Sequence, residues 1–271
     1  MFSKNVIIDL PKKDDIVHHE FVTDFHMGNA NWQEHLALKR RKAIANDPLR
    51  FMSFGGDQLD LILAGDPRFR DQAVRIGTRG AQMDAFDEFW DELFHQQVRY
   101  LDGKDKNEKI WYEQWGNHEW NSRVMDEDSF RRWTLEHGTD YMGSKAFIGV
   151  DIRYKGKSLM KKTMFVNHGA GGGNPEKALH DLTVNVEADI YEMGHLHVPL
   201  GFKEDILYMD QKTNHWGTKE QILINGGCFT TAVRDGTSQW MEEKGNKLKV
   251  SKPGTMTVSF NAYQGSLNYH G

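Results

Sequence analysis

Six short runs of β-branched and aromatic residues, each halted by a glycine or a polar turn residue, constrain the fold of this chain most strongly. Runs of this kind are typical of β-strands. Stretches with helical spacing separate several of them, and alternating strands and helices favour an α/β fold. Functional groups in open α/β sheets gather where strands end. The runs are residues 21–23, 51–54, 110–112, 164–166, 190–191 and 222–224.

Apolar residues recur three and four positions apart in the intervening segments, which predicts amphipathic helices. The clearest segment runs from Met83 to Leu101, with Gly103 as a plausible stop. Beyond position 197 the sequence reads as β-rich, with strands expected at residues 206–208 and 255–260. Two further helices are expected, one containing Trp32, Leu36 and Ile44, and one capped by Asp126 or Asp128 and carrying Phe130 and Trp133.

The 271 residues contain no Pro-, Gly- or Ser-rich linker, so we expect one domain spanning residues 1–271. Residues 1–13 lack the apolar core of a secretory signal, and no apolar run approaches the ~20 residues of a membrane helix. The single cysteine, Cys228, excludes an intrachain disulfide and fits a reducing compartment. We therefore expect a cytoplasmic protein. Its net charge of −5 argues against generic adhesion to nucleic acid.

Residues that commonly bind metals follow the predicted strands. Carboxylate, amide and imidazole groups without thiolates suit Mn, Fe or Zn. Each motif alone is common, but the four multi-residue motifs in this order have a random expectation below ~1 in 10,000. They supply enough ligands for two adjacent ions. The motifs are Asp24-Phe25-His26, Gly56-Asp57-Gln58-Leu59-Asp60, Gly116-Asn117-His118-Glu119, a lone His168, and Gly194-His195-Leu196-His197.

The order and spacing of these motifs resemble the calcineurin-like metallophosphoesterase superfamily. That pattern is Asp-x-His, Gly-Asp-x-x-Asp, Gly-Asn-His-Asp/Glu, a lone His, and Gly-His-x-His. The resemblance covers positions 24 to 197, about two thirds of the chain. It implies an α/β fold built as a four-layer αββα sandwich, with two mixed β-sheets flanked by helices. It also implies a two-metal site at the edge of the sheets.

The resemblance assigns the ligands of two divalent metal ions. We expect Mn, with Fe, Zn or Ni as alternatives. Asp24 and His26 lie two positions apart, so both would point the same way from an extended strand end. Asp57 would be shared by the two ions. Asp24, His26 and His197 would hold the first ion, and Asn117, His168 and His195 would complete the second.

The implied reaction is hydrolysis of a phosphoester by a hydroxide that bridges the two ions. Two adjacent ions lower the pKa of a bound water and stabilise charge on the phosphate. His118 would protonate the departing oxygen. Asp60 would orient the His118 imidazole through a carboxylate–histidine pair. Four arginines near the motifs could each reach a phosphate oxygen, although exposed surface arginine is the simpler interpretation of each: Arg70, Arg75, Arg79 and Arg123.

The motifs mix features of two branches of the superfamily. Glu119 resembles the protein Ser/Thr phosphatases, whereas Gly-His-Leu-His resembles cyclic-nucleotide phosphodiesterases and repair nucleases. The phosphatase branch usually reads Asp-Arg-Gly where this chain reads Asp60-Leu61-Ile62. We predict a phosphodiesterase or phosphomonoesterase acting on a small-molecule nucleotide or a nucleic acid, without a protein partner. The alternatives are a protein-phosphatase-like phosphomonoesterase and a non-catalytic binding scaffold, while one cysteine argues against a structural zinc site.

Overall fold

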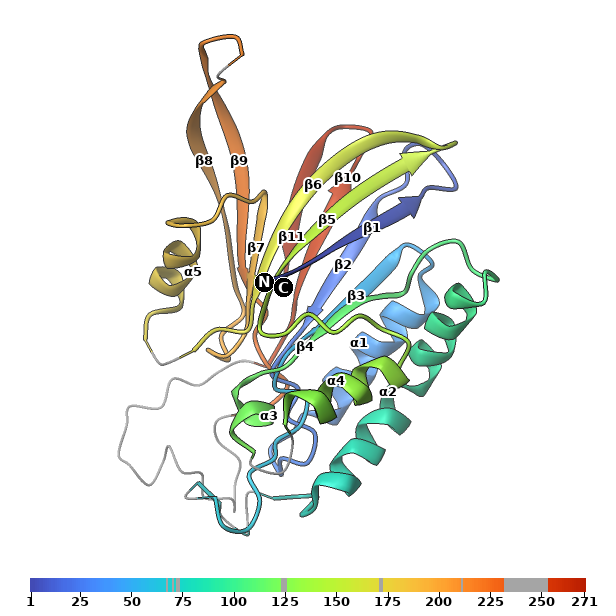
Figure 1. The fold of residues 1–271 in the computed structure, drawn as a ribbon, viewed down its shortest axis with the longest axis vertical. Helices are drawn as coiled ribbons and strands as arrows, with labels where there is room; N and C mark the ends of the chain where they lie inside the picture. Colours follow the sequence, from blue (N-terminus) through green and yellow to red (C-terminus); the bar gives the residue numbers. More distant parts are fainter. Residues whose placement is uncertain are drawn as a thin grey trace.

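The computed structural model describes residues 1–66, 68–69, 71, 74–122, 126–170, 173–210, 212–231 and 253–271. Within these residues the chain forms two mixed β-sheets and five helices (Figure 1). The six-stranded sheet has the order β1 (Phe2–Asp9), β5 (Lys145–Tyr154), β6 (Lys157–Asn167), β7 (Ile190–Met193), β9 (His215–Asn225) and β8 (Leu200–Asp210). The five-stranded sheet has the order β11 (Ser266–His270), β10 (Met256–Asn261), β2 (Val17–Val22), β3 (Arg50–Gly55) and β4 (Ile110–Gln114).

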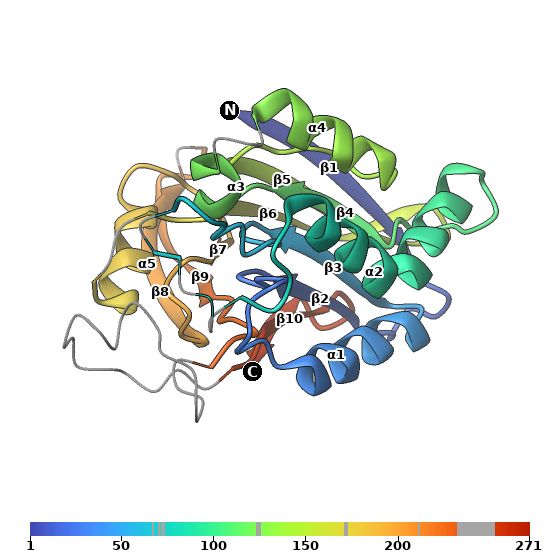
Figure 2. The ribbon, with the colours of Figure 1, turned by 90° about the horizontal axis from the view of Figure 1, so that it is seen from below.

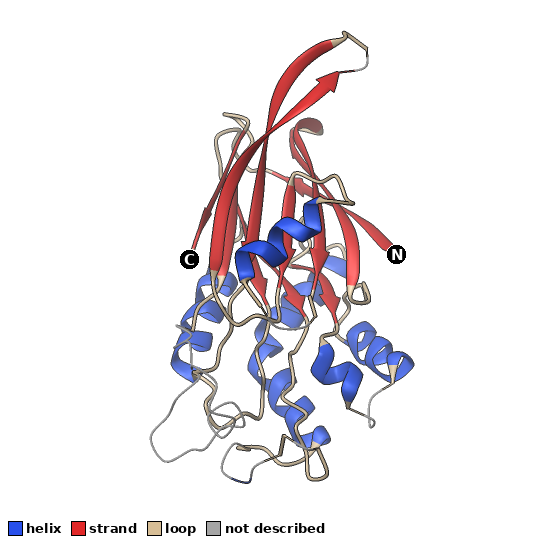
Figure 3. Cartoon of the chain, turned by 90° about the vertical axis from the view of Figure 1, so that its left-hand side faces the viewer, coloured by secondary structure: helices blue, strands red, loops and turns tan. Residues whose placement is uncertain are grey.

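Each sheet contains a parallel set of three strands. In the five-stranded sheet β2, β3 and β4 run parallel, and in the six-stranded sheet β6, β7 and β9 do so. Antiparallel strands extend both sets, with β10 beside β2, β5 beside β6 and β8 beside β9. The carboxyl ends of parallel neighbours meet at one edge of a sheet, where loops and helices follow (Figure 3).

Apolar side chains hold the two sheets and the helices together. One buried cluster joins the sheets and includes Phe21, Trp111 and Val166. A second cluster, with Phe54 and Trp90, packs α1 (Glu34–Asn46), α2 (Arg79–Leu101) and α4 (Glu127–Glu136) against the five-stranded sheet. A third packs α5 (Pro175–Thr183) against the six-stranded sheet. This arrangement, visible end-on in Figure 2, is consistent with a sandwich.

The predicted elements are largely confirmed. The six apolar runs lie in β2, β3, β4, β6, β7 and β9, and the later strands are β8 and β10. Asp126 rather than Asp128 caps α4, because its side chain accepts a hydrogen bond from the Ser129 amide at 2.7 Å. The prediction for Trp32 was wrong: α1 begins at Glu34, and the indole packs instead on Phe25. No helix in the described ranges is long and apolar enough to cross a membrane.

Candidate metal centre

The predicted ligands come together at the carboxyl ends of the parallel strands. Asp24 and His26 follow β2, Asp57 follows β3, and Asn117 begins α3 (Asn117–Asn121) just after β4. His168 follows β6, and the His195 loop follows β7. Three groups of side chains have their ligand atoms within 4.8 Å of one another, as a metal ion requires: Asp24, His26 and His197; Asp57, His168 and His195; and His26, Asp57 and His118.

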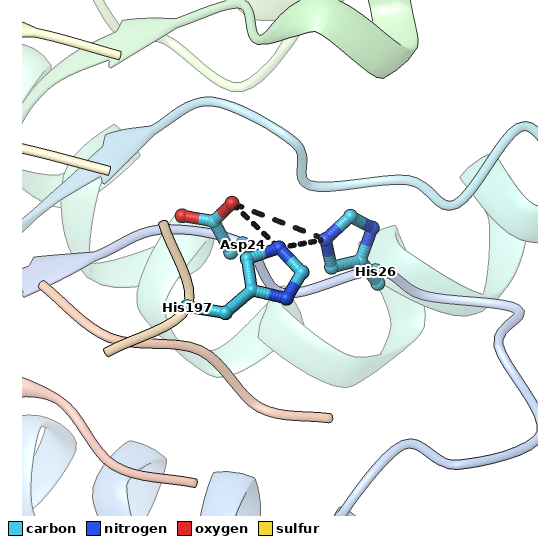
Figure 4. Close-up of side chains that lie close together, drawn as sticks. All are labelled: Asp24, His26 and His197. Atoms are coloured by element: carbon cyan, nitrogen blue, oxygen red, sulfur yellow. Dashed lines mark hydrogen bonds and ion pairs between the residues drawn. The ribbon is translucent and has the colours of Figure 1, made fainter. Parts of the chain in front are cut away.

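The first group converges from both sheets (Figure 4). Asp24 Oδ1 lies 3.1 Å from His197 Nε2 and 3.9 Å from His26 Nε2. The two Nε2 atoms of His26 and His197 are themselves 3.0 Å apart. Asp24 is fully buried, whereas the His197 side chain is 36 % exposed. Three potential ligand atoms therefore face one another at a point that solvent reaches beside His197.

Asp24 is anchored through one oxygen only. Its Oδ2 accepts hydrogen bonds from Thr23 Oγ1 at 2.7 Å and from the His195 amide at 2.8 Å. Its Oδ1 is buried and has no hydrogen-bond donor. Burial opposes the charge of this carboxyl, but the neighbouring His197 imidazole holds the pKa of Asp24 below its usual value. An unsatisfied, ionised oxygen of this kind fits a cation ligand.

The second group is built in the same way around Asp57. Its Oδ1 accepts a hydrogen bond from the His118 amide at 2.8 Å, and its Oδ2 lies 3.2 Å from His168 Nε2. His168 Nδ1–H donates to the Gly55 carbonyl at 2.8 Å, which turns Nε2 toward the ligands. Metal-binding histidines commonly use the second nitrogen this way. The Asn117 side-chain oxygen also lies 3.3 Å from His168 Nε2.

Charge in this group is balanced by histidines. Burial opposes the ionisation of Asp57, but the charges of His168 and His118 hold its pKa well below the ordinary value. Burial likewise opposes protonation of His168, yet Asp57 and Asp24 raise the pKa of His168 to about 10. The protonated imidazole thus supplies positive charge between two carboxylates. A divalent cation would do the same and displace that proton.

The prediction for how Asp60 orients His118 needs correction. His118 Nδ1–H donates to the main-chain carbonyl of Asp60, not to its carboxylate. The carboxylate instead accepts a hydrogen bond from Asn29 at 3.0 Å and lies 3.5 Å from His26 Nδ1. The physical reason is that Asn29 and His26 engage the carboxylate, which leaves the main-chain carbonyl of Asp60 as the acceptor for His118.

The site backbone is strained, and the expectation of an extended strand end at Asp24 and His26 was wrong. Both residues have φ of 50°, in the left-handed region that non-glycine residues rarely adopt. Such conformations cost about 1–3 kcal/mol each and cluster at functional sites. Five predicted ligands share this geometry, with φ between 50° and 72°: Asp24, His26, Asp57, His195 and His197.

Glycine is required at two motif positions because other parts of the site pack directly against the backbone there. A Cβ atom at Gly116 would lie 2.0 Å from Asp57 Oδ1, and one at Gly194 would lie 2.2 Å from Thr23 Oγ1. Real Cβ atoms essentially never approach a non-bonded atom this closely. Glycine at these two positions therefore lets the third and fifth motifs pack against Asp57 and Asp24.

Glu119 was missed as a structural part of the site. Its buried carboxylate accepts hydrogen bonds from the amides of Gly116 at 2.8 Å and of Asp57 and Leu59 at 3.0 Å each. Burial and the charge of Asp57 raise the pKa of Glu119 to about 7. Glu119 thus ties the second motif to the third. Its place three residues after the helix-capping Gly116 is the capping-box spacing, which could have indicated this role.

Arg68 was also missed, because it lies in a loop without a motif. Its Nη1 is 3.3 Å from His118 Nε2, and its Nη2 donates to Asp66 at 2.8 Å. Of the arginines considered from the sequence, Arg75 pairs with Glu34 at 3.2 Å on the surface. Arg79 begins α2, while positions 70 and 123 lie outside the described residues.

Comparison with models of known protein families gives no match for this chain, and no curated protein matches it.

Proposed function

We propose that this protein is a dinuclear-metal phosphoesterase of the calcineurin-like type, with its two sheets and outer helices forming the four-layer αββα sandwich of that superfamily. One observation carries the proposal. Two groups of potential ligands, one around Asp24 and one around Asp57, converge at the same edge of the sheets. In each carboxylate, one oxygen accepts a hydrogen bond from a backbone amide and the other oxygen lies beside a histidine nitrogen. Paired sites of this composition support in-line displacement at phosphorus.

The residues present fit two divalent cations. Asp24, His26 and His197 would hold one ion, and Asn117, His168 and His195 the other, with Asp57 between them. Oxygen and nitrogen ligands without thiolate suit Mn, with Fe, Zn or Ni as alternatives. When bound, such ions neutralise phosphate oxygens and lower the pKa of a bound water. The buried Asp24 Oδ1, which lies 3.1 Å from His197 Nε2 and accepts no main-chain hydrogen bond, supports a cation at the first position.

The chain itself would handle the leaving group. His118 uses Nδ1–H to bond the Asp60 carbonyl, so Nε2 would give a proton to the departing oxygen after the ring has taken up a second proton from solvent and become an imidazolium. The Arg68 guanidinium lies beside that nitrogen and could bind a phosphate group through two parallel N–H···O hydrogen bonds. We propose a nucleotide or a nucleic-acid end as the substrate, either a diester or a monoester.

The test measures metal content and turnover on the same protein. Metal-free protein is loaded with Mn²⁺, its metal equivalents are counted, and bis-p-nitrophenyl phosphate and p-nitrophenyl phosphate are assayed side by side. We expect two equivalents and hydrolysis that chelation abolishes. His95→Asn, at an imidazole that is 73 % exposed, serves as the matched control and should change nothing. Two bound ions without hydrolysis would favour the non-catalytic scaffold. Fewer than two equivalents would contradict the proposal.

A further inference from the structure

A second polar cluster lies beneath the candidate site, inside the apolar layer between the sheets. His19 Nε2 is 2.8 Å from Ser53 Oγ, and His19 Nδ1 is 3.0 Å from Glu192 Oε1. The Tyr112 hydroxyl donates to the other oxygen of Glu192 at 2.9 Å. None of the four side chains is exposed. We call these four residues, His19, Ser53, Tyr112 and Glu192, the inter-sheet network.

The inter-sheet network is internally satisfied. With a neutral His19, Ser53 donates to Nε2, Nδ1–H donates to Glu192, and Tyr112 donates to the second carboxylate oxygen. Burial and the charge of Glu192 raise the pKa of Tyr112 well above its usual value, which keeps the phenol protonated as a donor. The His19 ring also stacks on Trp111, with centroids 4.2 Å apart and planes 6° from parallel.

Stability alone does not account for such a network. Replacing a buried polar or ionic cluster with apolar side chains of similar volume is often neutral or stabilising. Buried polar groups do restrict the packing to one arrangement, because every alternative leaves a donor or acceptor unpaired. The network therefore restricts how the two sheets lie against each other: His19, Ser53 and Tyr112 belong to the five-stranded sheet, and Glu192 belongs to the six-stranded sheet.

The strands that carry the network lead into the loops that hold the ligands. His19 on β2 lies five residues before Asp24, and Ser53 on β3 lies four residues before Asp57. Tyr112 on β4 and Glu192 on β7 likewise stand three to five residues before Asn117 and His195. Each of the first two ligand groups combines the sheets: His197 comes to Asp24 from the opposite sheet, and His168 and His195 come to Asp57.

We propose that the inter-sheet network is a positioning device that sets the placement of the two sheet edges and thereby the spacing of the ligand atoms. The expected effect of the network on metal binding rests on the proposed function, whereas its expected effect on the positions of the loops does not. Loosening the network should let the loop after β7 move relative to the loops after β2 and β3. The bonds that report a shift between the sheets are those of the His195 amide to Asp24 Oδ2 and of the Phe229 amide, after β9, to the Asp24 carbonyl, at 2.8 and 3.1 Å.

The test uses Ser53→Ala and Tyr112→Phe, each of which removes one hydroxyl. The matched control is Ser259→Ala on β10, a strand that leads to none of the predicted ligands. Ser259 Oγ also bonds a histidine, His18, at 2.8 Å and is 5 % exposed. Hydrogen exchange of the His195 and Phe229 amides, which bond across the two sheets, is measured on metal-free protein, followed by Mn²⁺ titration and thermal unfolding of each variant.

We expect these amides to exchange about tenfold faster in Ser53→Ala and Tyr112→Phe, and Mn²⁺ to bind about tenfold more weakly, as for lost supporting bonds at other metal sites. Ser259→Ala should lose thermal stability without either change. If the three variants exchange these amides at one common rate, whether the wild-type rate or a faster one, the proposal is overturned. This holds even if all three variants lose thermal stability. Faster exchange together with a wild-type protein that binds no Mn²⁺ would support positioning and contradict the proposed function instead.

Discussion

At the residue scale, the candidate ligands share one design. Asp24 and Asp57 each give one oxygen to a backbone amide, and His168 gives Nδ1–H to a carbonyl. The second carboxylate oxygen of each aspartate and the Nε2 atom of His168 then face another potential ligand. Side chains held in this way lose little freedom when a cation binds, because their rotamers are already set. Left-handed conformations persist only where surrounding contacts fix them, and these hydrogen bonds provide such contacts at Asp24 and Asp57.

We predict that His118→Asn keeps both metal ions and loses most turnover. The His118 bond to Asp57 comes from the main-chain amide, which the substitution keeps, whereas the His118 Nε2 atom would supply the proton to the leaving oxygen. Loss of a general acid typically lowers the rate by about 10²–10⁴. The measurement is kcat for bis-p-nitrophenyl phosphate with metal content determined on the same sample. Unchanged kcat would show that another group donates the proton.

Arg68→Ala should raise KM for the phosphoester by about tenfold while metal content stays at the wild-type value. A hydrogen bond to a charged group contributes about 1.5–3 kcal/mol, and Arg68 stands next to His118 with Asp66 holding it. Arg75→Ala is the matched control, since Arg75 pairs with Glu34 at the surface. Equal KM values for the two variants would remove Arg68 from substrate binding.

At the element scale, the sequence predicted fully buried strands and amphipathic helices better than strands with one exposed face. The runs in β2, β3 and β4 are apolar because those strands are buried on both faces. Phe2–Asp9 escaped prediction as β1 because only Val6 and Ile8 are buried on this edge strand. The short α3 was missed since five residues show no helical period.

The candidate site likewise has a part that the sequence predicts, the ligands, and a part that it does not, the residues that hold them. Ligand positions could be predicted because motif spacing is a property of the sequence, and all nine predicted residues lie at or beside the converging loops. The residues that hold those ligands could not be predicted, because their role depends on contacts between distant segments. Thr23, Arg68 and the Asn29 contact that redirects Asp60 are examples.

The packing of α4 against β4 and α2 depends on a charged histidine. His137, just after α4, lies 2.8 Å from Glu113 on β4 and 3.0 Å from Asp87 on α2. Burial opposes its charge, but Glu113 and Asp87 raise the pKa of His137 to about 9. A raised histidine pKa stabilises the fold fully below the unfolded value of about 6.5 and loses that stabilisation as pH rises through about 9.

We therefore predict that His137→Gln lowers the free energy of unfolding by about 3 kcal/mol at pH 6, the usual cost of breaking a buried pair. The difference from wild type should shrink as the pH approaches 10. Urea unfolding at several pH values measures it, and taking the difference cancels other groups such as Lys109, whose pKa burial lowers to about 8. A difference that does not change with pH would mean that His137 is neutral in the fold.

At the scale of the whole molecule, the candidate centre is a junction between the sheets. Asp24, His26 and Asp57 come from the five-stranded sheet, while His168 and His197 come from the six-stranded sheet. A cation bound by both sets would add cross-links that the unfolded chain cannot make. Binding to the folded state alone stabilises a protein by RT ln(1 + [L]/Kd). Metal loading and global stability should therefore change together.

We predict that Mn²⁺ at about 100 times its Kd raises the free energy of unfolding by about 2.7 kcal/mol for each ion bound. In a chain of this size that corresponds to a rise in Tm of about 5 °C or more. Asp57→Asn should abolish most of the rise, because Asp57 is the carboxylate proposed to be shared by the two ions, whereas His95→Asn, at an exposed imidazole, should retain it. Thermal scans with Mn²⁺ and with chelator measure the effect. If Mn²⁺ binds without raising Tm, the ions bind the unfolded chain as tightly as the folded one, and the site is not one that the fold assembles.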